Sequence, residues 1–127
     1  MTAPTRTTRE ILASQPLAAA SSGNEAAPGL IGAWVSVADL NGGLLQAYVT
    51  NGGTAPGTAG QFIWQASDKN DNTNIVELWR GGGNTTASSS PPIPAIDLPK
   101  EFNYVRLVCY GNTSAAVTYR GVLFGKG

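Results

Sequence analysis

Residues 102–110 read Phe-Asn-Tyr-Val-Arg-Leu-Val-Cys-Tyr, and this stretch decides the fold class. Successive side chains of a β-strand point to opposite faces, so its odd-numbered and even-numbered residues form two faces. Both faces are largely apolar, with Val105, Leu107 and Cys109 on one and Val108 on the other. We therefore predict a central strand that is buried on both sides. Cys109, the only cysteine, is then a buried small hydrophobe rather than a reactive thiol.

The segment that follows this stretch predicts a hairpin. Gly111, Asn112 and Thr113 form a turn sequence, because Gly and Asn tolerate a positive φ angle. Residues 115–124 follow as a second strand with several large apolar side chains. The two strands are therefore predicted to pair as a C-terminal hairpin.

The N-terminal side of the chain contains more short stretches with a period of two, bounded by Gly, Pro, Asn and Ser. They predict strands at residues 31–38, 43–50, 60–67, 75–80 and 93–98, with a further short one at residues 10–13. Pro91, Pro92 and Pro94 confine the strand at residues 93–98 to a sheet edge. About seven strands at this spacing predict an all-β fold, an antiparallel β-sandwich of the jelly-roll or immunoglobulin-like type.

The chain has 127 residues, which is enough for one domain with a hydrophobic core. Residues 1–29 are rich in Ala, Thr and Ser and contain few large apolar side chains, so we expect an extended N-terminal arm there. This arm is either a free tail or a segment that becomes ordered by adding a strand to a neighbouring subunit. Residues 30–127 are expected to form the β-sandwich domain, with an exposed loop at residues 51–60 and an exposed, mobile one at residues 81–90.

Charge and hydropathy argue against several partners. Eight basic and eight acidic side chains are spread along the chain without a run of either sign, which argues against nucleic acid as the main partner. The apolar stretches are shorter than the roughly 20 residues of a membrane-spanning helix, so we expect a soluble protein with no membrane partner. Residues 1–10 lack the apolar stretch of a secretion signal, which favours synthesis in a cytoplasm without export by that route.

The chain contains no histidine, which removes the usual activated nucleophiles and the commonest ligand of transition metals. Two carboxylate pairs, Asp68 with Asp71 and Asp97 with Glu101, occur in turn-like contexts that are typical of solvated loops rather than of an acid and base pair. Residues 68–74 are only superficially similar to a calcium loop, because the required Gly and Glu are missing. We therefore expect no enzyme activity, no catalytic residues, no metal and no cofactor.

Three tryptophans, Trp34, Trp64 and Trp79, fall within predicted strands. Trp64 shares a face with Phe62, which predicts a core position, whereas Trp79 shares a face with Glu77, which predicts a rim or an interface. Exposed tryptophans can also stack on sugars, so a carbohydrate-binding module is an alternative function of another class.

Several short motifs of the chain resemble those of small virion proteins of tailed phages. Those proteins have an "ITNG…GP" loop before their middle strands and a C-terminal "YVRV…GNT…VTVEA" hairpin. The similar segments here are Ile11-Leu12-Ala13-Ser14, Gly42-Gly43-Leu44-Leu45, Val49-Thr50-Asn51-Gly52-Gly53-Thr54-Ala55-Pro56, Gln65-Ala66-Ser67-Asp68, Tyr104-Val105-Arg106-Leu107, Gly111-Asn112-Thr113 and Val117-Thr118. The last strand departs from the pattern, because Tyr119-Arg120-Gly121 replaces the usual acidic and small pair. The resemblance implies a strand-rich virion component and implies no particular activity.

A protein without catalysis or strong charge suits a capsid decoration or cement role, in which copies brace neighbouring capsomers through many modest contacts. The expected partners are the major capsid protein or other virion proteins and further copies of the chain, with a trimer favoured. The expected location is the virion, after synthesis in the cytoplasm of a bacterial host. A tail, baseplate or fibre-attachment protein is the alternative within the virion. The predicted interface residues are Arg6, Arg9, Ile11, Leu12, Leu17 and Trp79.

Overall fold

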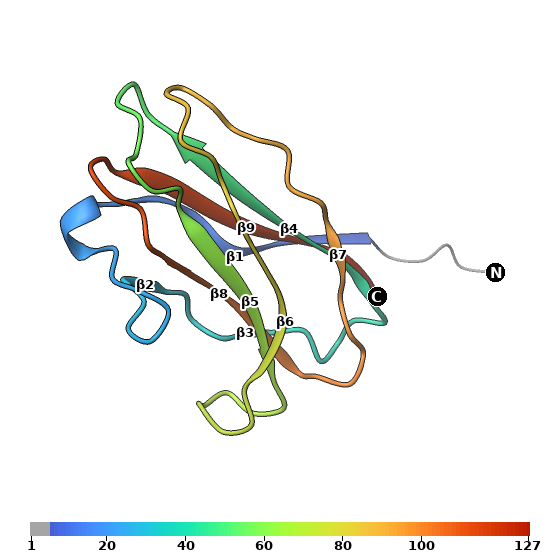
Figure 1. The fold of residues 1–127 in the computed structure, drawn as a ribbon. Coiled ribbons are helices and arrows are strands. Elements are labelled where there is room, and N and C mark those ends of the chain that lie inside the picture. The colour runs from blue at the N-terminus through green and yellow to red at the C-terminus, as the bar shows by residue number, and fades with distance from the viewer. Residues whose placement is uncertain (1–5) are drawn as a thin grey trace.

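Two antiparallel sheets pack face to face in the computed structural model, which describes residues 6–127 (Figure 1). The first sheet consists of β1 (Arg6–Leu17), β9 (Val117–Lys126), β4 (Gly43–Asn51) and β7 (Ile96–Asp97), in this spatial order. The second sheet consists of β2 (Leu30–Ile31), β8 (Tyr104–Tyr110), β5 (Gln61–Ser67) and β6 (Val76–Gly82), and β3 (Val35–Ser36) also pairs with β8. A short 3-10 helix, η1 (Ala19–Ser21), lies between β1 and β2. The predicted antiparallel β-sandwich is confirmed, and residues 6–127 include no helix long and apolar enough to cross a membrane.

The core lies between the two sheets and follows the predicted alternation along the strands. Leu45, Ala47 and Val49 of β4 point inward and are at most 1% exposed, whereas the residues between them face outward. In the second sheet, β8 lies between β5 and the short strands β2 and β3, as predicted for a central strand. Cys109 is fully buried, and burial raises the pKa of its thiol, so it behaves as a small apolar side chain.

The predicted C-terminal hairpin is wrong, because β8 and β9 belong to different sheets. β8 pairs with β5, whereas β9 pairs with β4 and β1. The connection at residues 111–116 crosses from one sheet to the other (Figure 1). Gly111 supplies a φ of 88° where this crossing begins. The turn sequence at this position therefore marks a crossing between sheets, and the hairpin of the second sheet is formed instead by β5 and β6.

The predicted N-terminal arm is also wrong for residues 6–17, which form β1 and pair with β9 from end to end. Ile11, Leu12 and Leu17 lie in the core with exposures of 4%, 5% and 6%, so β1 is part of the sandwich and the predicted boundary between residues 29 and 30 separates no arm from it. Register shifts on both sides of Leu12 turn two adjacent side chains inward, which hides the strand from a period-two pattern. Residues 1–5 of the predicted arm lie outside the described residues.

The loop at residues 81–90, predicted to be mobile, is anchored to the end of β4 by Asn51. Nδ2 of Asn51 donates hydrogen bonds of 2.9 Å to the carbonyl oxygens of Asn84 and Thr86 and to Oδ1 of Asn84. The backbone N–H of Asn51 also donates to the carbonyl oxygen of Ser89 at 2.9 Å. Because Asn51 is only 2% exposed, water does not compete for these bonds.

Candidate interaction surface

The outer face of the first sheet carries an exposed apolar patch formed by Leu44, Tyr48 and Phe124. Leu44 and Tyr48 project from β4, and Phe124 lies directly opposite Leu44 on β9. These residues are 44%, 41% and 45% exposed, and they are three of the six large apolar residues exposed within residues 6–127. The outer faces of antiparallel sandwich sheets are ordinarily polar. Exposed apolar patches are a common feature of surfaces that bind other molecules, so this face is the candidate interaction surface.

Arg120 forms a polar border of the apolar patch. Its guanidinium lies 5.6 Å from the ring centre of Tyr48 and donates to both carboxylate oxygens of Glu10, at 2.7 and 3.1 Å. The hydrogen bond from Arg120 lowers the pKa of Glu10. Because the Arg120 and Glu10 side chains are 45% and 41% exposed, the pair orients the side chains on this face more than it stabilises the fold.

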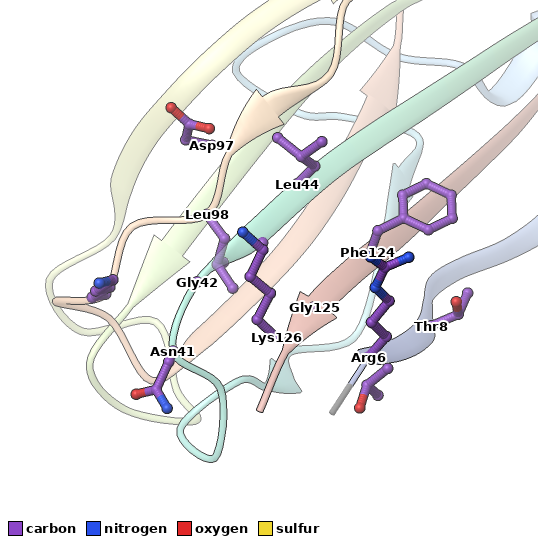
Figure 2. A pocket seen from close by; sticks show the side chains of 13 residues that line it. Arg6, Thr8, Asn41, Gly42, Leu44, Asp97, Leu98, Phe124, Gly125 and Lys126 are labelled. Carbon is purple, nitrogen blue, oxygen red and sulfur yellow. The ribbon is translucent and has the colours of Figure 1, made fainter. Parts of the chain in front are cut away.

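An open hollow of about 780 Å³ adjoins the apolar patch at one end of the first sheet (Figure 2). It lies where β1 and β4 begin and β9 ends. Leu44 and Phe124 contribute its apolar wall. The charged side chains that line it are Arg6, Lys100, Lys126 and Asp97.

Two glycines shape this end of the sheet. Gly42 and Gly43 have φ angles of 115° and 148°, which other residues rarely adopt. A Cβ atom at Gly43 would lie 2.4 Å from the carbonyl oxygen of Phe124, so the strands approach one another more closely here than a side chain would permit. The backbone N–H of Lys126 donates to the carbonyl oxygen of Gly42 at 3.0 Å. The hollow is therefore bordered by backbone that is held in place on both strands.

Of the predicted interface residues, the structure brings Arg6 to this surface. Ile11, Leu12 and Leu17 are buried within their own chain and are not available to a partner, so they are corrected from interface residues to core residues. The apolar patch itself escaped prediction. The sequence does contain a signal for it. β4 and β9 each carry apolar residues at outward-facing positions, where a strand with one face in the core ordinarily has polar residues.

Arg9 and Trp79 have structural contacts of their own. The guanidinium of Arg9 donates to both carboxylate oxygens of Asp39 at 2.9 and 2.7 Å and to the carbonyl oxygen of Ser36 at 2.8 Å. These contacts join β1 of the first sheet to β3 of the second sheet and to Asp39, which follows β3. Trp79 is partly buried on β6, where its ring packs against Phe62 with a centroid distance of 5.7 Å.

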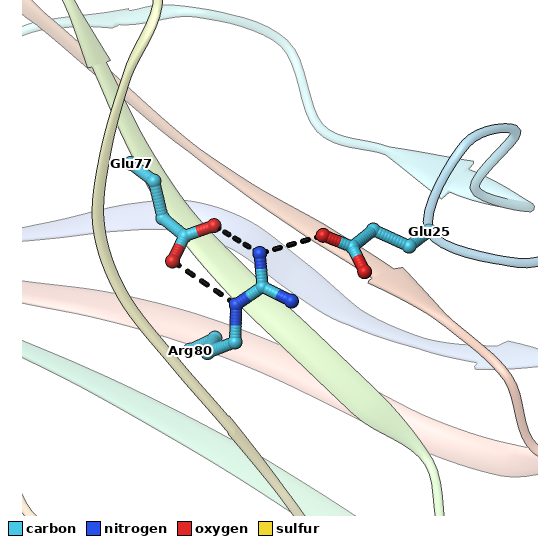
Figure 3. A network of polar contacts seen from close by, with 3 residues as sticks. All are labelled: Glu25, Glu77 and Arg80. Carbon is cyan, nitrogen blue, oxygen red and sulfur yellow. Dashed lines mark hydrogen bonds and ion pairs between the residues drawn. The ribbon is translucent and has the colours of Figure 1, made fainter.

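Arg80 holds Glu25 and Glu77 together on the second sheet (Figure 3). It donates to both carboxylate oxygens of Glu77, three residues away on β6, and at 2.6 Å to Glu25 in the loop before β2. These hydrogen bonds lower the pKa of both carboxyl groups. The cluster therefore ties the loop before β2 to β6.

The carbohydrate-binding alternative loses one of the three tryptophans on which it would depend. Trp64 is 1% exposed, which confirms its core position and prevents it from stacking on a sugar. Trp34 is covered on one face by the guanidinium of Arg106, 4.3 Å from its ring centre.

Asp71, one of the paired carboxylates, accepts the backbone N–H of Thr73 at 2.8 Å within its own turn. No three His, Cys, Asp or Glu side chains gather as a possible metal site within residues 6–127.

The fold and this surface define an antiparallel β-sandwich with an apolar patch on one outer sheet face. No known family model matches the chain, and no curated protein matches it in sequence. In structure it is similar to the SPBc2 prophage-derived protein YomS, with a TM-score of 0.47 and 13% sequence identity over 98% of this chain and 96% of that one.

Proposed function

We propose that this chain is a non-enzymatic structural component of a tailed-phage virion, and that it acts as a capsid decoration protein. The observation that carries the proposal is the apolar patch, where Leu44 and Phe124 lie side by side on the outer face of the first sheet. The motifs that resemble those of small virion proteins support the choice of a tailed-phage virion as the particle. In this proposal the patch rests on the major capsid protein or another virion protein.

The energetics suit a role that uses many copies. Fully burying a large apolar side chain contributes about 1.5–3 kcal/mol, and the three residues of the patch are already more than half covered by their own chain. On docking, burial of the remaining surface then contributes roughly 1 kcal/mol of binding free energy per patch residue, so each single copy binds with modest affinity. Many copies on a symmetric shell bind with high avidity even though each single contact is weak. A homotrimer would contribute to this avidity, because it presents three patches at once.

Co-sedimentation with virions that lack the protein tests the proposal. A Leu44→Ser, Phe124→Ser variant should bind particles at least tenfold more weakly than the wild-type chain, because two apolar contacts are lost. The matched control is Ile75→Ser, Val76→Ser, which removes an apolar pair of similar exposure, 37% and 42%, at the start of β6 in the second sheet. Circular dichroism is used to check that both variants are folded. Equal losses in the two variants, or no loss in the first, would contradict the proposal.

The tail, baseplate or fibre-attachment alternative uses the same surface on a different neighbour. It differs in how many copies each particle holds, because a shell offers far more equivalent sites than a tail. Immunogold labelling of intact virions distinguishes the two. We expect label over the whole head, and label confined to the tail would favour the alternative.

A further inference from the structure

We infer that the hollow beside the apolar patch receives an acidic segment of the partner protein, with an apolar side chain next to its carboxylate. This inference rests on the proposed function and specifies the chemistry of the partner. Its basis is the composition of the hollow, where Leu44 and Phe124 stand beside three cationic side chains.

The cations of the hollow form no ion pair within residues 6–127. In the part of the chain that the structure describes, all ion pairs are formed by three other cations, Arg9, Arg80 and Arg120. Arg6, Lys100 and Lys126, by contrast, line the hollow together with a single carboxylate, that of Asp97. An unpaired group of like charges is a ready site for the opposite charge.

The positions of these cations are set by the backbone around them. Lys100 follows β7, and its Cε lies 3.6 Å from the place where a Cβ of Gly42 would be, so its stem lies across that glycine. Arg6 and Lys126 are paired residues of β1 and β9. The charges thus come from three separate segments that line one hollow, and Figure 2 shows the side chains of Arg6 and Lys126 at this end of the sheet.

An acidic protein segment fits this site better than nucleic acid does. Nucleic-acid sites need a stripe of positive charge along the backbone, whereas here the cations are confined to one hollow on a chain of zero net charge. The wall formed by Leu44 and Phe124 also requires an apolar neighbour, which a peptide supplies next to its carboxylate. Charge complementarity would set the orientation of docking, and the apolar patch would supply the remaining contact.

The test measures how salt affects binding to virions that lack the protein. An Arg6→Gln, Lys100→Gln, Lys126→Gln variant is compared with the wild-type chain and with Lys69→Gln, a control lysine in the exposed turn between β5 and β6. At 50 mM salt we expect the triple variant to bind about tenfold more weakly, as the loss of three exposed charge pairs implies. Wild-type binding should weaken as salt rises and screens these pairs, whereas binding of the triple variant should change little. Lys69→Gln should behave as wild type.

Each outcome separates the two proposals. If the wild-type chain binds but the triple variant matches it in affinity and salt dependence, the acidic-segment inference is overturned and the decoration role stands. If the wild-type chain does not bind virions at all, the decoration role is overturned and this inference with it. A fluorescent single-stranded DNA probe provides the last comparison. If the wild-type chain binds that probe and the triple variant does not, the hollow is a nucleic-acid site and the inference is overturned.

Discussion

The hydroxyl of Tyr119 donates a hydrogen bond of 2.9 Å to Oδ1 of Asn112, and neither residue has exposed surface. Nδ2 of Asn112 donates in turn to the carbonyl oxygens of Leu17 and Ala115, at 3.0 and 2.9 Å. The carbonyl oxygen of Asn112 accepts the hydroxyl of Ser22 at 2.7 Å. This cluster joins the end of β1, the crossing between the sheets and the start of β9, and burial makes each of its bonds costly to break.

Replacing Tyr119 with Phe should lower the free energy of unfolding by about 1–3 kcal/mol, because Oδ1 of Asn112 would be left buried without its donor. Urea denaturation followed by tryptophan fluorescence measures the change. Tyr48→Phe is the matched control, because Tyr48 is 41% exposed on the outer face of the same sheet and should change stability by less than about 0.5 kcal/mol. Similar changes in the two variants would show that the hydrogen bond to Asn112 contributes nothing.

Gly60 leaves the space that the Tyr119 hydroxyl occupies. A Cβ at Gly60 would lie 2.1 Å from that oxygen, so Gly60→Ala should lower the free energy of unfolding by about 1–3 kcal/mol through overpacking. Gly52→Ala, where no atom lies within 4 Å of the added Cβ, should leave stability within about 0.5 kcal/mol. In a Tyr119→Phe background the cost of Gly60→Ala should shrink, and fully additive costs would refute the clash.

Asn51 should control the opening of the loop at residues 81–90. Asn51→Ala removes the three side-chain hydrogen bonds that reach Asn84 and Thr86, so the amide of Ser88, which donates to Gly52, should exchange with deuterium at least tenfold faster. Hydrogen exchange by NMR measures this effect. The control is Asn70→Ala in the exposed turn after β5, which should leave the exchange of Ser88 unchanged. Unchanged exchange in the Asn51 variant would mean that the loop is held by other contacts.

Arg80→Gln should raise the pKa of Glu77 toward its ordinary value of 4.5, since the hydrogen bond from Arg80 is the main cause of its lowering. A carboxyl pKa that is lowered by folding stabilises the folded chain above the unfolded-state pKa, and this contribution is lost as pH falls through the folded-state pKa. The variant should therefore be less stable than wild type at pH 7 and equal to it at a pH below the folded-state pKa of the carboxyl groups. Because the Arg80 side chain is 46% exposed, the difference should be small and should decrease with added salt.

NMR titration of the Glu77 carboxyl measures the pKa, and urea denaturation at both pH values measures the stability. Lys69→Gln serves as the control for the loss of one positive charge. A difference between wild type and the Arg80 variant that persists undiminished at low pH would contradict an origin in the Glu77 and Glu25 carboxylates.

The period of two in the sequence predicted the strands well and their pairing poorly. Along residues 43–50 the buried side chains alternate as expected for a strand with one face in the core. In β8 the consecutive residues Leu107, Val108 and Cys109 are all buried, as predicted for a central strand that is covered on both sides. The turn chemistry of Gly111 and Asn112 was correct as well, yet a turn of this composition serves a hairpin and a crossing between sheets equally. Which one forms depends on long-range pairing of β9 with β1 and β4, which local sequence does not encode.

The same reason explains the errors at the N-terminus and at the candidate site. β1 contains few large apolar residues, and its register shifts break the alternation of buried and exposed positions. The position of β1 in the sheet is therefore determined by its pairing with β9, which its own sequence does not reveal. The apolar patch joins Leu44 to Phe124 across 80 positions of sequence, and only the register of β4 with β9 brings them together. The anchoring of residues 81–90 by Asn51 is a contact of the same long-range kind.

The most direct test of the virion role is the amount of this chain in virions purified through a density gradient, measured by quantitative mass spectrometry against the major capsid protein. A decoration protein occupies equivalent sites over the whole shell, so we predict a copy number comparable with that of the major capsid protein. Absence of the chain from virions that the same cells release in an infectious form would contradict the account.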